Sequence, residues 1–205
     1  MNMLKHLLYA VCAVMAAVSC GTATPLTITG QESGIIRNSP QVMRILTVDN
    51  AQDSLFLRQA SRNFNVVDIN SSDFVTLVAK MTATVTDPEV GGVGIAAPQV
   101  GIGRRLIVVQ RFDKEGEPFE AYVNPYIVET AGELQTGPEG CLSVPDRRGD
   151  VPRYQEITVR YTDMASDRID QPREITEVVK GYTAVIFQHE IDHLDGIIYT
   201  DRIVK

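Results

Sequence analysis

The sequence predicts an α+β fold in which strands lie between two main helices. Three observations support this prediction. Apolar residues recur at helical spacing over 72–85, several short β-branched runs follow, and a second helical pattern ends near Gly196. We expect antiparallel or mixed strands packed around the C-terminal helix, with the other helix upstream.

Length and composition limit the class of protein. The 205 residues are about one domain long, and 44% hydrophobic with 22% charged residues is typical of a globular protein. The formal net charge of -7 argues against a basic, phosphate-binding surface, so we expect no nucleic-acid partner. Residues 40–205 contain no repeat, low-complexity tract or linker, and we expect them to form a single domain.

The N-terminal segment has the pattern of an export signal. Lys5 precedes an apolar run over 7–18, which is too short for a stable membrane anchor and has the length of a signal-peptide core. The run ends in AVSC and resembles a bacterial lipoprotein signal, in which cleavage leaves Cys20 as the lipidated N-terminus. The alternatives are a plain secretory signal or an N-terminal helix.

This interpretation predicts a processed and exported protein. We expect a signal peptide over 1–19, a tether rich in Thr, Gly and Ser over 20–39, and membrane attachment only through a lipid on Cys20. The protein would then face the periplasm or the exterior; it would be cytoplasmic if the signal is not used. With Cys12 removed and Cys20 lipidated, Cys141 is the one thiol left free.

The helix over 72–85 should bury one face. Ser72 is its expected N-cap, and Asp87 followed by Pro88 should end it. The residues that recur at helical spacing are Phe74, Leu77, Val78, Met81 and Val85.

Short strands are expected between the helices, because their segments are rich in β-branched residues and bounded by turn-forming residues. A polar loop over 164–172 should join the last two strands. The expected strands cover 105–110, 121–124, 126–130, 156–162 and 173–179.

The last helix carries the strongest chemical signal, in the stretch QHEIDHLDG over 188–196. His189 and His193 lie one helical turn apart, so both imidazoles can reach one metal ion, and Glu190 lies beside them. The alternative is a pair of surface histidines on an amphipathic helix. By itself, the motif is typical of a zinc peptidase.

The third ligand discriminates between enzyme classes. Downstream of Gly196, Asp201 is the sole acidic candidate. Upstream, Cys141 in PEGCLSVP would complete a set of one thiolate and two imidazoles, with a fourth position open for water.

Three segments together resemble the peptide deformylase family: GVGIAAPQ over 92–99, EGCLS over 139–143 and QHEIDHLDG over 188–196, in the family's order and at similar spacing. The resemblance extends from about Pro40 to Ile203 and implies the peptide-deformylase fold. It also implies removal of the formyl group from formyl-methionyl peptides or proteins, with release of formate. Formylated peptide N-termini would therefore be the partners.

The resemblance also implies the roles of individual residues. Glu190 would be the general base and acid, and Gln99 with the backbone N–H of Leu142 would bind the oxyanion. The metal ligands would be Cys141, His189 and His193.

Substrate-binding residues follow from the same resemblance. The substrate path would be lined by Val93, Gly94 and Ile95, and the methionine pocket would be bordered by Tyr182, Val185 and His189. Val185 could equally be a core residue, and Arg148, expected to face the substrate backbone, could be solvated surface.

The resemblance implies one divalent ion per chain, Fe²⁺, although the same ligands also suit Zn²⁺ or Ni²⁺. Export favours zinc somewhat, because iron(II) held by a thiolate is prone to oxidation outside the cytosol. Two other functions remain open. One is an exported metal-dependent peptidase or amidase, and the other is a low-turnover module that binds peptide N-termini.

Overall fold

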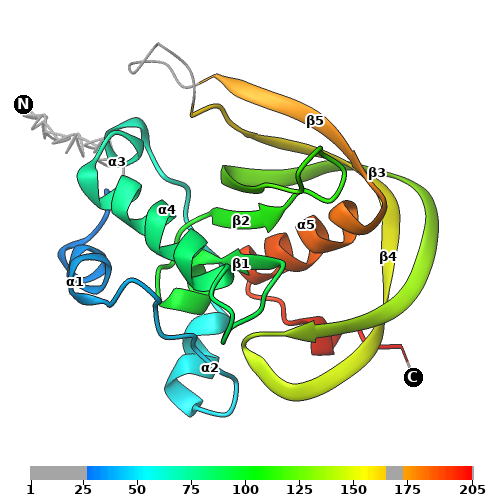
Figure 1. Cartoon of the computed structure of the whole chain (residues 1–205), viewed down its shortest axis with the longest axis horizontal. Helices are drawn as coiled ribbons and strands as arrows, with labels where there is room; N and C mark the ends of the chain where they lie inside the picture. The colour runs from blue at the N-terminus through cyan, green and yellow to red at the C-terminus, as the bar shows by residue number, and fades with distance from the viewer. Residues whose placement is uncertain (1–26, 165–172, 205) are drawn as a thin grey trace, which may run out of the picture.

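The computed structural model describes residues 27–164 and 173–204 (Figure 1). The expected signal peptide, Cys20, the first part of the tether and most of the polar loop over 164–172 lie outside the described residues. Within the described ranges, no helix combines the length and apolar character needed to cross a membrane.

A helix stands where the second half of the tether was expected. Helix α1 spans Gly30–Asn38 and begins with a capping box, in which Thr29 and Glu32 satisfy each other's backbone N–H groups. Ile36 is completely buried, and Lys80 Nζ donates to the carbonyl oxygen of Ile36 at 2.7 Å. The expectation of a tether reaching residue 39 is therefore wrong, because this helix buries apolar side chains on the domain.

Three further helices precede the sheet: α2 (Ala51–Leu57), α3 (Val66–Ile69) and α4 (Ser72–Val85). Helix α4 has the predicted bounds, but its N-cap is Ser71 and not Ser72. The Ser71 hydroxyl accepts a hydrogen bond from the backbone N–H of Phe74 at 3.1 Å.

Five antiparallel strands form one sheet in the order β1-β2-β3-β4-β5. The expected strands over 121–124 and 126–130 are parts of one 23-residue strand, and the expected strand over 156–162 is the end of a 19-residue strand. Register shifts interrupt the pairing of the two long strands without ending it. The strands therefore continue past glycines and prolines that, in the sequence, suggested strand boundaries. The strands are β1 (Gly94–Ala96), β2 (Leu106–Gln110), β3 (Phe119–Cys141), β4 (Val144–Thr162) and β5 (Glu174–Lys180).

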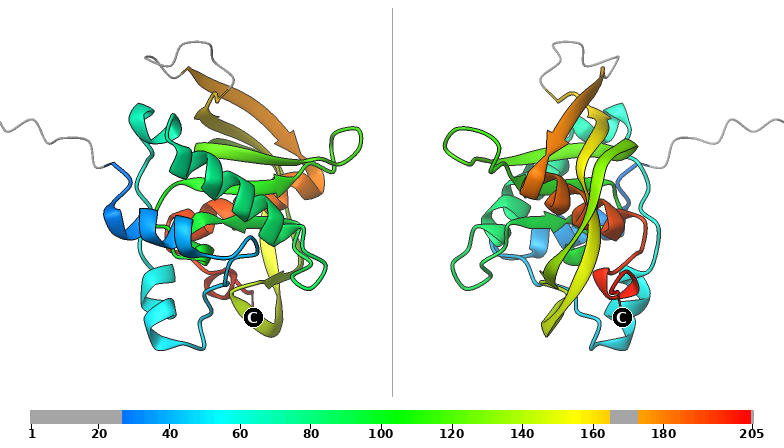
Figure 2. Two further views of the ribbon diagram at one scale, coloured as in Figure 1. Left: turned by 60° about the vertical axis from the view of Figure 1, so that its left-hand side comes forward. Right: turned by 90° about the vertical axis from the view of Figure 1, so that its right-hand side faces the viewer.

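Helix α5 (Gly181–Leu194) lies inside the bend of this sheet, where it contacts β4, β1 and β2 (Figures 1 and 2). Side chains of β2 alternate between two cores. Leu106 and Val108 pack with α4, whereas Ile107 and Val109 pack with α5. Both faces of β2 are therefore covered, and this strand is packed between the two cores.

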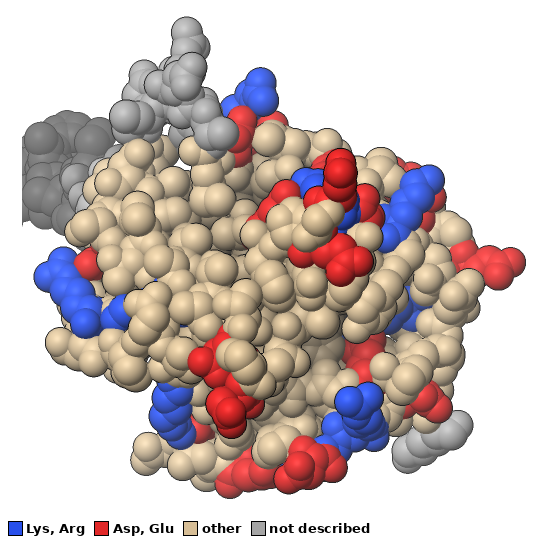
Figure 3. All heavy atoms as spheres, in the orientation of Figure 1, with Lys and Arg blue, Asp and Glu red and all other residues tan. Residues whose placement is uncertain are grey.

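Two short 3-10 helices complete the fold. One, Ala97–Val100, follows β1, and the other, Tyr199–Asp201, follows α5. Gly196 has a φ of 74°, and this left-handed conformation ends the helical region as predicted. On the face shown in Figure 3, basic side chains are scattered among acidic ones.

Candidate active site

A thiol and two imidazoles converge at one point of the structure. The candidate ligand atoms of Cys141, His189 and His193 all lie within 4.8 Å of one another. The Sγ atom of Cys141 is 3.2 Å from Nε2 of His193. A thiolate with two imidazoles is a donor set suited to borderline and soft divalent ions, so these residues fit a metal site.

The strand pair β3–β4 carries Cys141 to the helix. The register shifts between Gly140 and Cys141, which places the thiol at a tight turn. The backbone N–H of Ser143 donates to Cys141 Sγ at 3.4 Å, and the carbonyl oxygen of Ser143 accepts from Val48 at 2.9 Å. The turn is therefore fixed to the segment before α2.

His189 is oriented by a buried carboxylate. Its Nδ1 lies 2.8 Å from Oε2 of Glu139, and Arg153 binds the same carboxylate through Nε at 2.7 Å and Nη2 at 3.1 Å. Burial opposes ionisation of Glu139, but the hydrogen bonds to His189 and Arg153 dominate and lower its pKa to about 2. With Nδ1 engaged, Nε2 of His189 is left for the centre of the site.

His189 and His193 have different electrostatic surroundings. Burial lowers the pKa of His193 well below its usual value. Burial acts in the same direction on His189, but hydrogen bonds to Cys141 and Glu139 outweigh it and raise the pKa to about 10.

Glu190 follows the candidate ligand His189 on helix α5. Its side chain is buried, and among the described residues no hydrogen-bond partner faces its Oε2. Burial raises its pKa to about 7, although the nearby His189 opposes this shift. A carboxyl group with a pKa close to neutrality can both accept and return a proton.

Gln99 presents its amide nitrogen to the site. Its Oε1 accepts a hydrogen bond from the backbone N–H of Ala96 at 2.8 Å, which fixes the direction of the amide. Its Nε2 lies 3.2 Å from Ser143 Oγ and 3.6 Å from Cys141 Sγ. The side chain thus offers N–H groups next to the candidate metal ligands.

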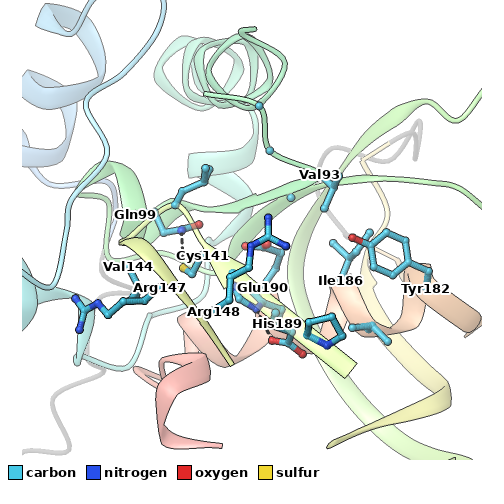
Figure 4. A pocket seen from close by; sticks show the side chains of 18 of the residues that line it. Val93, Gln99, Cys141, Val144, Arg147, Arg148, Tyr182, Ile186, His189 and Glu190 are labelled. Atoms are coloured by element: carbon cyan, nitrogen blue, oxygen red, sulfur yellow. Dashed lines mark hydrogen bonds and ion pairs between the residues drawn. The ribbon is translucent and has the colours of Figure 1, made fainter. Parts of the chain in front are cut away.

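A pocket of about 730 Å³ opens over this centre. Val93, Ile186 and Tyr182 lie together on one side, and Arg147 and Arg148 lie on the other (Figure 4). Predicted site residues among its lining are Val93, Gly94, Gln99, Cys141, Leu142, Arg148, Tyr182, Val185, His189 and Glu190.

Two predicted site residues lie outside the lining. His193 is buried, and its Nε2 still lies 3.2 Å from Sγ of Cys141, which lines the pocket. Ile95 is completely buried and packs in the core beside α4. Its side chain therefore does not line the substrate path as expected, because alternation along β1 points it away from Gly94 and the pocket.

Sequence reasoning missed Glu139 and Arg153. Glu139 is the first residue of the EGCLS segment, so its closeness in sequence to the candidate ligand Cys141 could have indicated its role. Arg153 had no such signal, because its contact depends on the pairing of Glu139 with Gly149 across the two long strands. Asp146 and Arg147, which also line the pocket, were likewise not predicted.

Comparison with known proteins agrees with this geometry. The family model described as Polypeptide deformylase matches residues 42–205. The peptide deformylase of Leptospira biflexa serovar Patoc (strain Patoc 1 / Ames) is 34% identical over 169 residues, covering 79% of this chain and 88% of the relative. The peptide deformylase of Symbiobacterium thermophilum is 50% identical over 111 residues, which are 54% of this chain and 48% of that relative. This chain thus aligns with about half of the Symbiobacterium protein.

Solved structures give the same result. The Met-Ala-Ser-bound class I type b peptide deformylase from Acinetobacter baumannii matches with a TM-score of 0.67 and 35% identity over 79% of this chain and 98% of that chain. The peptide deformylase from Thermotoga maritima matches with a TM-score of 0.65 and 31% identity over 80% of this chain and 99% of that chain. The family model and these relatives cover most of the described residues, so the chain belongs to the polypeptide deformylase family of metal-dependent hydrolases.

Proposed function

We propose that this chain, a metal-dependent peptide deformylase, removes the formyl group from formyl-methionyl N-termini and that Cys141, His189 and His193 hold its metal ion. The observation that carries the proposal is the convergence of these three side chains within 4.8 Å beside the buried carboxyl group of Glu190. A divalent ion held there supplies Lewis-acid activation of water.

Glu190 handles the proton in this proposal. Its carboxylate takes a proton from the attacking water, and the resulting carboxylic acid gives that proton to the departing amine, so the carboxylate is regenerated in each turnover. A pKa raised to about 7 by burial supports both steps. Glu190 lines the pocket and no described residue bonds to its Oε2, so this carboxyl group has an oxygen left to bond with substrate or water there.

Gln99 and Leu142 stabilise the developing oxyanion. The amide of Gln99 is held by Ala96, so its N–H groups are oriented before substrate arrives. Leu142 lies in the pocket lining next to Cys141, and its backbone N–H is the second proposed donor. In measured cases, loss of one such donor costs about 3–4 kcal/mol of transition-state stabilisation.

The pocket separates the two ends of a bound peptide. We assign the methionine side chain to the apolar side, where Val93 and Tyr182 lie (Figure 4). Val185 also lines the pocket and is assigned to the same wall. Arg148, on the opposite side, would face the peptide backbone. Binding of Met-Ala-Ser by the Acinetobacter baumannii relative supports a peptide in this pocket.

The proposed metal is Fe²⁺, with Zn²⁺ or Ni²⁺ as alternatives that suit the same thiolate and imidazole ligands. Metal analysis of protein purified anaerobically tests this choice. Iron at close to one per chain is the expected result, and zinc or nickel at that ratio would replace iron in the proposal.

Formate release from a formyl-Met tripeptide tests the activity. The full chain is purified anaerobically and supplied with Fe²⁺, Ni²⁺ or Zn²⁺. Glu190→Gln should abolish release, whereas Glu133→Gln, an exposed position on β3, should leave it unchanged. Bound metal without formate release would contradict the proposal and favour a peptide-binding module. Cleavage of unformylated peptides would favour a peptidase or amidase.

We further propose that the chain is exported and anchored by a lipid on Cys20. The apolar run over 7–18 followed by AVSC supports this proposal. In a bacterial host, labelled fatty acid should be incorporated into the wild type and lost in Cys20→Ser, and the wild type should fractionate with membranes. An unlabelled protein in the cytosolic fraction would contradict the proposal.

A further inference from the structure

We propose that Arg202, near the C-terminal end, is a positioning residue for His189. It acts through a line of alternating charges that passes behind the metal site, from Arg202 through Asp192, Arg153 and Glu139 to His189. This inference rests on the proposed role of His189 as a metal ligand.

The outer part of the line joins the C-terminal segment to helix α5. Arg202 grips Asp192 with two hydrogen bonds, from Nε to Oδ2 and from Nη2 to Oδ1, both 2.6 Å long. Arg153 Nη1 also donates to Oδ2 of Asp192, at 2.6 Å. One carboxylate thus holds two guanidinium groups.

The inner part of the line reaches the imidazole. Arg153 uses its Nε and Nη2 atoms to hold Glu139, whose Oε2 is 2.8 Å from Nδ1 of His189. Every member between Arg202 and His189 is buried, with Asp192 7% exposed, Arg153 4% and Glu139 8%. Their contacts are therefore little screened by solvent.

Arg202 is needed to balance the charges of the two buried carboxylates, Asp192 and Glu139. In the wild type, two guanidinium groups neutralise two buried carboxylates. Without Arg202, Arg153 would be shared between Glu139 and Asp192 as their one guanidinium partner in the line. The attraction of Arg153 to Asp192 would then increase and weaken its hydrogen bonds to Glu139. As a result, His189 would lose its fixed orientation.

Other contacts hold the C-terminal segment in place without Arg202. The backbone N–H of Val204 donates to the carbonyl oxygen of Asp150 at 3.0 Å, and the Tyr199 hydroxyl donates to that of Arg147 at 2.9 Å. Ile203 packs closely against Gly149: a Cβ atom added to Gly149 would lie 2.4 Å from the Cδ1 atom of Ile203. Loss of the Arg202 side chain should therefore act through Asp192 and not by releasing the segment.

The test compares Arg202→Gln with Asp201→Asn in the full chain loaded with Co²⁺. Asp201 is the matched control, because it lies next to Arg202 on the same segment and pairs with Arg58 at the end of α2. Among the described residues, no hydrogen bond or ion pair joins Asp201 to Asp192. Two readouts are used: the rate at which a chelator removes Co²⁺, and the visible absorption of bound Co²⁺, which reports ligand geometry.

Arg202→Gln should lose Co²⁺ roughly three- to tenfold faster than the wild type. This effect is smaller than the 10–100-fold loss of metal affinity that is typical when a ligand's direct partner is removed. The absorption spectrum of Arg202→Gln should shift, whereas Asp201→Asn should match the wild type in both readouts. Equal rates in Arg202→Gln and wild type would overturn the inference. Equal acceleration in both variants would also overturn it, because segment docking alone would then be responsible.

Failure of the proposed function would look different. In that case the wild type would not hold Co²⁺ through Cys141, and the thiolate-to-cobalt absorption would be missing from the wild type itself. A wild type that binds Co²⁺ normally, together with an unaffected Arg202→Gln, contradicts only the positioning role.

Discussion

A Cβ atom on Gly94 would lie 2.5 Å from Oε1 of Glu190 and 2.9 Å from its Cγ and Cδ atoms. The backbone of β1 thus passes the proposed proton-transfer group at a distance that only glycine permits. The glycine-rich segment before Gln99 serves the position of Glu190 as well as the path of the substrate.

Gly94→Ala should displace Glu190 and reduce kcat by roughly 100-fold, because a 1 Å misplacement of a reacting group can have an effect of that size. Metal content should stay at the wild-type level, since no ligand is touched. Steady-state deformylation with metal analysis checks both statements. Gly137→Ala is the control, because a Cβ there meets nothing within 4 Å. Wild-type kcat in Gly94→Ala would refute the close approach.

Glu139→Gln should weaken metal binding by about 10- to 100-fold, the usual effect of removing a ligand's hydrogen-bond partner. The amide keeps the shape of the side chain but loses the charge that Arg153 and His189 share. Chelator competition measures the affinity. Glu133→Gln, on the exposed part of the same strand, should bind metal like the wild type; a matching loss there would point to a general effect of charge.

Glu32→Gln should destabilise the protein at neutral pH by roughly 2–3 kcal/mol, because the buried guanidinium of Arg104 would lose one of its charged partners and keep the longer contact with Asp68. Burial opposes ionisation of Glu32, but its hydrogen bonds to Arg104 and Thr29 prevail and lower its pKa from the usual 4.5. A lowered folded-state pKa contributes stability above pH 4.5, and this contribution is lost as the pH falls further.

Urea unfolding of Glu32→Gln between pH 7 and pH 3 checks this expectation. The difference from the wild type should be largest at pH 7 and should shrink below pH 4.5. Glu89→Gln, an exposed carboxylate beyond α4, is the control and should have no effect at either end. A difference that does not change with pH would show that the carboxylate charge of Glu32 is not responsible.

Gly196→Ala should destabilise the fold by more than about 2 kcal/mol. The left-handed φ of 74° alone is unfavourable for alanine by roughly 1–2 kcal/mol. In addition, the new Cβ would lie 2.5 Å from the backbone oxygen of Arg58, which cannot move as a side chain does. Thermal unfolding measures the loss.

Gly34→Ala is the matched substitution for Gly196→Ala. Gly34 lies inside helix α1 with open space around its Cα, so alanine should stabilise the protein by about 0.5–1 kcal/mol. A rise in Tm for Gly34→Ala and a fall for Gly196→Ala is the expected pair. A fall for both would contradict the helical assignment of α1.

The sequence alone determined the chemistry of the site. The spacing of His189 and His193 places two imidazoles on one helical face whatever the rest of the chain does, because helix geometry repeats locally. Cys141 in EGCLS and the segment ending in Gln99 then matched one family's pattern. The helix over 72–85 and the final helix were equally predictable, since each keeps its apolar spacing over several turns.

Only the tertiary structure decided which groups support that chemistry. Glu139 meets Arg153 through the register of two long strands, and Arg202 meets Asp192 of α5 after the 3-10 helix Tyr199–Asp201. Neither contact follows from local spacing. The same holds for Ile95, which the packing of α4 turns into a core residue, and for α1, which is helical where a tether was expected. Long-range pairing and burial fix these features, and a local pattern carries no record of which distant segment will pack against it.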